Sequence, residues 1–129
     1  MTDEHWINAP KTLAEVESAF LRYEAALTGN DIDVRDELFW NDTRTVRYGA
    51  TENLVGYAAI QSFRQGRSPI GLMRSLGNTV ITTFGDRFAT TSTEFVREGD
   101  SRIGRQMQTW VRQPEGWRIT AAHVSFLSD

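Results

Sequence analysis

The sequence predicts an α+β domain in which N-terminal helices pack on a strongly curved, mostly antiparallel sheet. In the first half of the chain, apolar residues recur at three- and four-residue steps, the period of a helix packed on one side. From Leu72 onward they alternate, the period of a strand. Helices followed by a meander of strands are typical of α+β folds with segregated layers. Because 129 residues suffice for one core but not two, we expect a single domain over residues 1–129.

The long first helix carries the clearest pattern. Its apolar stripe consists of Leu13, Val16, Phe20, Tyr23 and Leu27. Thr12 and Glu15 have the spacing of a capping box and mark the expected start, and Gly29 marks the expected end. Tyr23 is therefore expected on the side of the helix that faces the core.

Two shorter helices are predicted on either side of a turn. The first follows Asp31, whose side chain can cap it. Its apolar residues Val34 and Leu38 bring Trp40 toward the core. After the turn and a short strand, residues 55–65 return to helical spacing and predict a third helix.

The second half of the chain predicts four long antiparallel strands. Their ranges are 72–84, 87–98, 102–113 and 117–126. Glycine and proline occupy the turns between them, at positions that β-turns favour. A strongly bent sheet of this kind, wrapped around the first helix, would leave a cavity between the two layers.

Composition excludes several classes of partner and site. The net charge of -3 argues against nucleic acid as the main partner. No stretch approaches the roughly 20 apolar residues that span a bilayer, and the N-terminus lacks a signal-peptide pattern, so we expect a cytoplasmic protein. Without cysteine and with only two histidines, a metal site is not expected. The chain also lacks a phosphate-binding glycine loop, and no cofactor is expected.

The short strand after the second helix contains an arginine where burial is expected. It reads Val46, Arg47, Tyr48, and alternate side chains of a strand point to opposite faces. Either Val46 and Tyr48 form a core pair and Arg47 faces solvent, or Arg47 faces the interior. A buried guanidinium needs an acidic side chain or an anionic ligand as its partner. The candidate partners within the chain are Glu24, Glu52 and Glu94.

The basic residues are unusual in kind, since Lys11 is the only lysine among 14 of them. One explanation is a genome that favours arginine codons. The other is function, because the planar guanidinium group matches a carboxylate in a way that the point charge of lysine does not.

Two resemblances rest on particular motifs. The ending GWRITAAHVS (116–125) and the order of elements resemble the SnoaL-like, or nuclear-transport-factor-two-like, superfamily, whose members fold as a cone around a pocket. The segments FLRYEAAL (20–27), DELFWNDTRTVRYGATENLVGY (36–57), RSPIGL (67–72) and GRQMQTWVR (104–112) resemble the oxalurate-catabolism (HpxZ-like) family. That family includes the AtzH-like 1,3-dicarboxyurea decarboxylase of cyanuric acid degradation. The resemblance implies a cone-shaped α+β barrel, a homodimer or higher homo-oligomer, and a small, nitrogen-rich, carboxylated substrate.

The resemblance also implies a catalytic pair. In related isomerases the first helix directs a tyrosine hydroxyl into the pocket, which suggests Tyr23 as a proton donor. From its pattern alone Tyr23 would be a core aromatic residue. Arg47, in the most characteristic segment, is implied to clamp a substrate carboxylate. Ketosteroid isomerases need a carboxylate base in this strand region, so steroid isomerisation is not expected.

Four further residues are candidates for substrate binding. They are Trp40, Arg74, Arg105 and His123. Each has a plainer alternative: a solvated strand face or an oligomer interface for the arginines, a structural hydrogen bond for His123, and a place in the core for Trp40.

The resemblance, together with these residues, implies a cofactor-independent lyase that decarboxylates a small N-carboxylated urea, 1,3-dicarboxyurea, to allophanate in cyanuric acid catabolism. Its expected partners are the small anionic substrate and further copies of the chain, without nucleic acid or membrane. Two alternatives remain. One is an accessory subunit that binds a small anion without turnover, and the other is an enzyme acting on another ureide in oxalurate catabolism.

Overall fold

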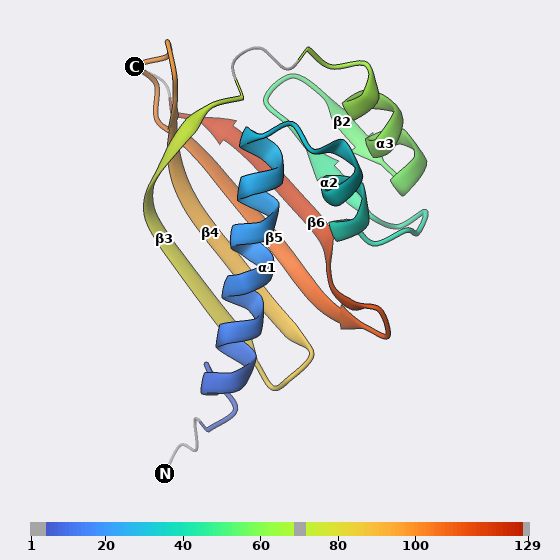
Figure 1. The fold of residues 1–129 in the computed structure, drawn as a ribbon, viewed down its shortest axis with the longest axis vertical. Helices are drawn as coiled ribbons and strands as arrows, with labels where there is room; N and C mark the ends of the chain where they lie inside the picture. Colours follow the sequence, from blue (N-terminus) through green and yellow to red (C-terminus); the bar gives the residue numbers. More distant parts are fainter. Residues whose placement is uncertain (1–4, 69–71, 128–129) are drawn as a thin grey trace.

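The structure, a computed structural model, describes residues 5–68 and 72–127. Its helices are α1 (Pro10–Thr28), α2 (Ile32–Leu38) and α3 (Tyr57–Gln65). Its strands are β1 (Val46–Tyr48), β2 (Asn53–Val55), β3 (Arg74–Phe84), β4 (Phe88–Arg97), β5 (Gly104–Gln113) and β6 (Gly116–Phe126). Figure 1 shows α1 lying across the long strands, with α2 and α3 beside it. None of these helices combines the length and apolarity needed to cross a bilayer.

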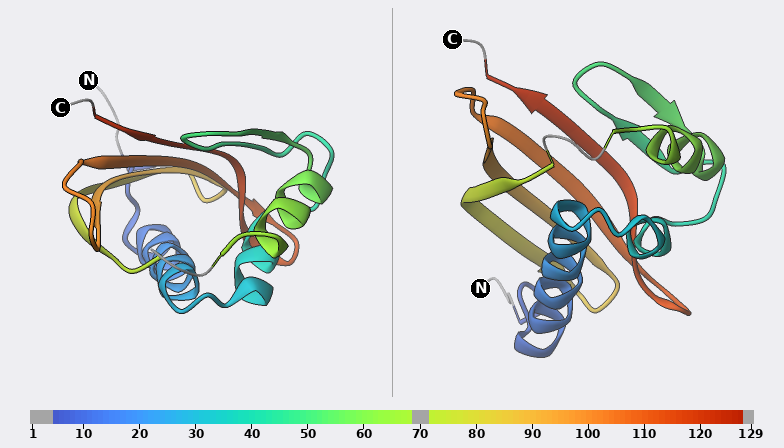
Figure 2. Two further views of the ribbon diagram at one scale, coloured as in Figure 1. Left: turned by 90° about the horizontal axis from the view of Figure 1, so that it is seen from above. Right: turned by 45° about the horizontal axis from the view of Figure 1, so that its top comes forward.

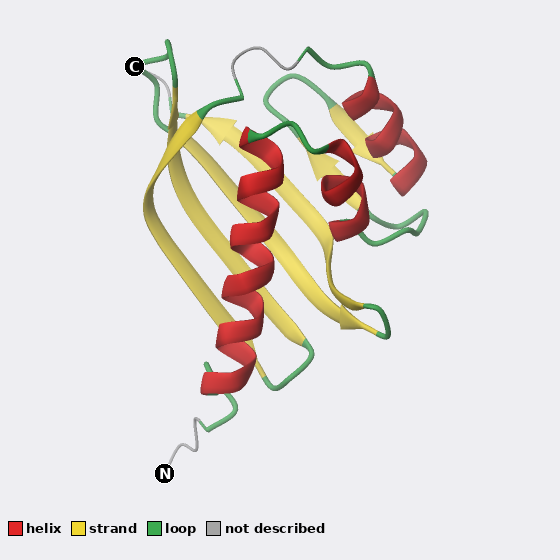
Figure 3. Cartoon of the chain, viewed as in Figure 1, coloured by secondary structure: helices red, strands yellow, loops and turns green. Residues whose placement is uncertain are grey.

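The strands form one six-stranded sheet in the order β2-β1-β6-β5-β4-β3 (Figure 3). The four long strands pair antiparallel as a meander, which confirms the four predicted strands. The short strand β1 pairs parallel with β6 and antiparallel with β2. In this register Arg47 lies between Leu54 of β2 and Ala122 of β6.

The sheet curves around α1, as the view from above in Figure 2 shows. Val16 and Tyr23 of α1 belong to one buried cluster with Trp110 of β5 and Ile119 of β6. The predicted α+β fold, with helices on one side of a curved and mostly antiparallel sheet, is therefore confirmed.

Two local predictions about helix starts have different outcomes. Asp31 caps α2 as predicted, because its side chain accepts a hydrogen bond from the backbone N–H of Val34 at 3.2 Å. The predicted capping box of α1 is wrong. The helix begins earlier, at Pro10, and Thr12 is a buried residue of its first turn. Proline is favoured at this first position because its missing N–H has no intrahelical partner there in any case.

The sequence did not predict β2. Its three residues, 53–55, are too few to show an alternating pattern, and residue 55 was expected to begin the third helix. The chain instead reverses after β1, where the N–H of Gly49 donates to the carbonyl of Glu52 at 2.8 Å. A positive φ of 94° at Gly56 then redirects the chain into α3.

A close approach in the core gives a test of the packing. A Cβ at Gly104 would lie 2.2 Å from the ring of Phe95, which is buried and contacts the ring of Phe126. We expect Gly104→Ala to lower the free energy of unfolding by about 1–3 kcal/mol, measured by urea denaturation. Gly66→Ala is the control, because a Cβ there lies 3.8 Å from its nearest neighbours. Equal losses in the two variants would contradict this account.

Candidate active site

Tyr23 lies among arginines on the inner side of the sheet. Its side chain is 3% exposed, and its ring meets that of Phe39 edge-on at a centroid distance of 6.0 Å. Five arginines interact electrostatically with its hydroxyl, and we call them the arginine cluster: Arg35, Arg47, Arg64, Arg67 and Arg74. They come from α2, β1, α3, the segment after α3, and β3. Only folding brings them together.

The arginine cluster makes Tyr23 unusually acidic. Burial alone would raise its pKa, because a phenolate is poorly stabilised away from water. The positive charges of Arg35, Arg64, Arg47 and Arg74 outweigh burial and lower the pKa of Tyr23 to about 8. An unperturbed tyrosine titrates at about pH 10. Below pH 8 the hydroxyl is therefore mostly protonated, and it is a stronger proton donor than a tyrosine in water.

Arg47 points into the molecule. It is 7% exposed, whereas Tyr48 next to it is 41% exposed. Of the two orientations that the sequence left open, the structure has Arg47 inside. Its Nη1 donates to Oε1 of Glu52 at 2.9 Å, so Glu52 is the partner among the three glutamates considered.

Two other members of the arginine cluster are also paired with carboxylates. Arg74 donates to both carboxylate oxygens of Glu24, at 2.6 and 2.8 Å, and to Gln106 at 3.2 Å. Arg64 donates to Asp36 at 2.8 Å. The side chains of both arginines are almost fully buried. These pairs fix the cluster in place and offset part of its charge.

The remaining two members, Arg35 and Arg67, form no ion pair within the described residues. Arg35 is 2% exposed, and its Nε has no hydrogen-bond partner there. Burial lowers the pKa of Arg35 to about 10. Burial also lowers the pKa of Arg67, and the positive charge of Arg47 lowers it further. Five arginines thus face three carboxylates, which leaves an excess of two positive charges around Tyr23.

A pocket of about 300 Å³ opens beside Arg47. Four of its ten lining residues are arginines, namely Arg47, Arg67, Arg97 and Arg102, and the only carboxylate among them is that of Glu52. This lining favours an anionic ligand. Within the described ranges, no three His, Cys, Asp or Glu side chains gather where they could hold a metal ion.

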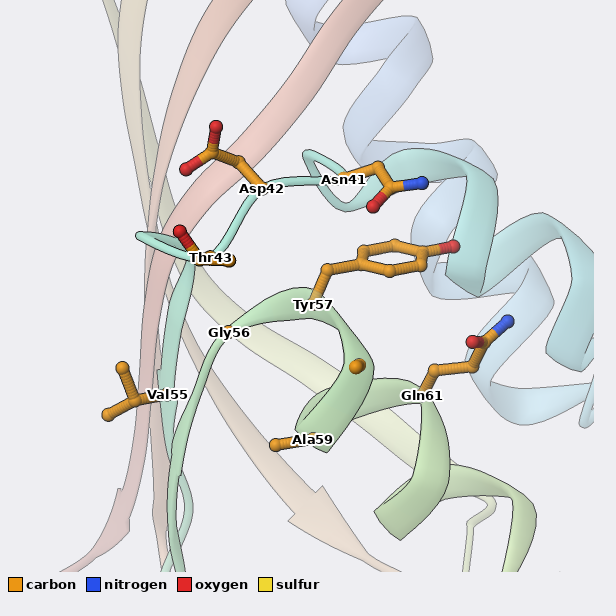
Figure 4. Close-up of a pocket in the computed structure, with 9 residues that line it drawn as sticks. Asn41, Asp42, Thr43, Val55, Gly56, Tyr57, Ala59 and Gln61 are labelled. Carbon is orange, nitrogen blue, oxygen red and sulfur yellow. The ribbon is translucent and has the colours of Figure 1, made fainter.

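A larger and more open depression of about 680 Å³ lies between residues 41–43 and the start of α3 (Figure 4). Tyr57 and Gln61 form part of its wall, and none of the sequence-predicted site residues lines it. The hydroxyl of Tyr57 donates to the backbone carbonyl of Asp36 at 3.0 Å, which links this wall to the ion pair of Arg64. No arginine lines the depression, so we place the candidate site at the smaller pocket.

Arg105 and His123 lie on the outer face of the sheet, away from the arginine cluster. Nη2 of Arg105 donates to Ser125 at 3.1 Å, and the ring of His123 meets that of Tyr48 at 6.1 Å. Strand alternation explains this, because the neighbouring Gln106 is buried on the inner face while Arg105 is exposed. These two residues therefore cannot contact a ligand held by Tyr23 and Arg47 within one chain, which corrects the expectation that they share its site.

Of the other two predicted binding residues, Arg74 and Trp40, only Arg74 lies in the arginine cluster. Trp40 is half-buried, and its ring contacts the exposed guanidinium of Arg44 at 5.1 Å. The described contacts of Trp40 thus do not include the cluster. Glu94, considered as a partner for Arg47, is exposed and lies opposite Arg105 in the sheet register.

Sequence reasoning missed Arg35, Arg64 and Arg67. The signal for Arg64 was its position four residues after the buried Ile60, on the inner stripe of α3. Arg35 lies three residues before the buried Leu38 in the same way. In α2 and α3 the arginine at helical spacing from a core residue is thus itself buried. Arg67 lies in the irregular segment after α3, where no such spacing is present.

Comparisons with known proteins agree on the fold and the family. The family model described as AtzH-like matches residues 5–129. A DUF3225-family protein of unknown function from Pectobacterium atrosepticum is 58% identical with a TM-score of 0.96, over 99% of this chain and 100% of that one. A cystatin-like fold protein from Burkholderia xenovorans is 47% identical with a TM-score of 0.91, over 95% and 97%. A nuclear transport factor 2-like protein from Salmonella enterica shares the fold at 20% identity, with a TM-score of 0.73 over 92% and 93%. The comparison with curated proteins gives no match.

The lowered pKa of Tyr23 can be measured directly. The chain has three tyrosines, and the pKa of Tyr57 is raised by its burial. In a titration followed by phenolate absorbance, we expect one tyrosine to ionise near pH 8. Tyr23→Phe should remove this step, and the control Tyr48→Phe should keep it. A wild-type protein with no ionising tyrosine below about pH 10 would contradict the electrostatic account.

Proposed function

Because the chain belongs to the AtzH-like family, we propose that it is a cofactor-independent lyase that converts 1,3-dicarboxyurea to allophanate and carbon dioxide. One observation carries the proposal: a tyrosine of lowered pKa lies in an arginine cluster with two uncompensated positive charges. A proton donor and an anion-binding field are the two requirements of this reaction.

The reaction needs one proton. When the bond between a urea nitrogen and its carboxylate carbon breaks, the bonding electrons stay on nitrogen and the carboxylate leaves as carbon dioxide. A proton from the hydroxyl of Tyr23 to that nitrogen lets it depart as a neutral amine group. The product is allophanate with one remaining carboxylate, and solvent then returns a proton to Tyr23.

Arg47 supplies the clamp in this mechanism. Among its described hydrogen bonds, only Nη1 is engaged, by Glu52. Nε and Nη2 are available to a substrate carboxylate in the two-pronged geometry that guanidinium groups favour. Since Arg47 also helps to lower the pKa of Tyr23, the same residue orients the substrate and strengthens the acid.

Glu52 is unsuited to act as a base at this site. Burial would raise its pKa, but hydrogen bonds from Thr51 and Arg47 and the charge of Arg47 lower it overall. A carboxylate of low pKa that is already paired with a cation is a weak proton acceptor. This supports proton donation by Tyr23 over the carbon-to-carbon proton transfer of an isomerase.

We expect Tyr23→Phe and Arg47→Ala to lower kcat/KM for carbon dioxide release at least about 100-fold, because each removes one partner of the chemical step. The rate above the uncatalysed background is followed with purified protein, and circular dichroism checks that each variant remains folded. Tyr48→Phe is the matched control, since Tyr48 follows Arg47 in β1 but is exposed on the outer face. Full activity in both site variants would refute the assignment. Substrate binding without turnover by the wild-type protein would instead indicate an accessory subunit.

The acid role of Tyr23 sets the sign of the pH dependence. Only the protonated hydroxyl can donate, and its pKa is about 8 in the free protein. We expect kcat/KM to be level below pH 8 and to fall about tenfold per pH unit well above it. A bound anion offsets part of the arginine field, so the corresponding fall in kcat should lie at higher pH. Activity that instead rises through pH 8 would mean that the phenolate is the active form.

A further inference from the structure

Arg35 stands out because it is a buried cation that no carboxylate pairs with in the described part of the chain, where its hydrogen-bond partner is Tyr23. It is 2% exposed, and its Nε donates to no atom there. An unpaired buried donor on a charged group is costly, and protein side chains normally satisfy it. A ligand that brings hydrogen-bond acceptors would remove this cost.

Arg67 connects Arg35 to the pocket. It lines the 300 Å³ pocket together with Arg47. The charges of Arg47 and Tyr23 act on Arg67, and the charge of Arg67 in turn acts on Arg35. Positive charge therefore continues from the pocket wall through Arg67 to the buried guanidinium beside Tyr23.

Gln106, which contacts the arginine cluster, has a second unpaired hydrogen-bond donor. Gln106 is 4% exposed, and its Nε2 has no hydrogen-bond partner among the described residues. Its Oε1 accepts from Arg74, which orients the amide within the arginine cluster. The unpaired nitrogens of Arg35 and Gln106 are both donors, so the group that would satisfy them carries acceptors.

We propose that Arg35 and Arg67 form a second carboxylate subsite, distinct from Arg47, and that the site thereby selects small dianions over monoanions. The inference rests on the proposed function in one respect, the placement of the substrate at Tyr23 and Arg47. Two excess positive charges match a substrate with two carboxylates. Once one carboxylate has left, the product satisfies only one of the two subsites, which favours its release.

Inert carboxylates test the subsite without chemistry. Isothermal titration calorimetry at pH 7 and constant ionic strength compares malonate, a dianion, with acetate, a monoanion. We expect wild-type protein to bind malonate at least about tenfold more tightly than acetate, because a second carboxylate gains a second charged partner. Equal affinities would overturn the proposal.

Substitutions then locate the second partner. Arg67→Gln should reduce the malonate preference to within about twofold and leave acetate binding nearly unchanged, because Arg47 remains. Arg35→Lys, which keeps the charge but lacks the guanidinium Nε–H, should also weaken malonate binding selectively. Arg87→Gln is the charge-matched control on the exposed hairpin between β3 and β4. If Arg67→Gln and Arg35→Lys both keep the wild-type preference for malonate, the proposed subsite is refuted. This conclusion does not depend on whether a less conservative variant such as Arg35→Gln folds.

Carbon dioxide release from 1,3-dicarboxyurea is measured separately with the same proteins. A malonate preference that depends on Arg67, without carbon dioxide release, would support the subsite and refute the decarboxylase. Carbon dioxide release without a preference for the dianion would support the decarboxylase and refute the subsite. The two proposals can therefore fail independently.

Discussion

The structure depends on how buried guanidinium groups around Tyr23 are neutralised. Burying a cation is costly unless a carboxylate or a ligand accompanies it. Three ion pairs meet this demand, and each joins separate parts of the fold. They are Arg74–Glu24 between β3 and α1, Arg64–Asp36 between α3 and α2, and Arg47–Glu52 between β1 and the turn before β2. The Arg74–Glu24 pair thus also holds α1 against the sheet, and the Arg64–Asp36 pair holds α2 and α3 together.

The chemistry of the site follows from the incomplete pairing of its arginines with carboxylates. Complete neutralisation would leave burial as the dominant influence on Tyr23 and raise its pKa. The excess charge instead lowers that pKa to about 8 and gives the neighbouring pocket an affinity for anions. Arginine suits this role better than lysine, because a guanidinium can bind two carboxylate oxygens and stack on a ring at once. Arg74 does both, with Glu24 and with the ring of Phe95 at 4.3 Å.

Predictions from periodicity succeeded where elements were long. The helix α1 and the four long strands were predicted from patterns of 10 or more consecutive residues, and all of them appear in the structure. The short strand β2 could not be predicted, because its pairing depends on β1 rather than on its own three residues. For Arg105 and His123, the family-like segment and strand position suggested the pocket. Their alternation with buried neighbours, also visible in the sequence, was the better guide to their outward orientation.

The sequence by itself determined the order of the helices and the long strands, the inward position of Tyr23 and the presence of an arginine in the short strand β1, because side-chain periodicity is a local property of the chain. Tertiary structure decided which way Arg47 points and which carboxylate holds it. It also decided that Arg35, Arg64 and Arg67 join the same cluster. These features depend on distances between elements far apart in the sequence, and the field at Tyr23 is a sum over all of them.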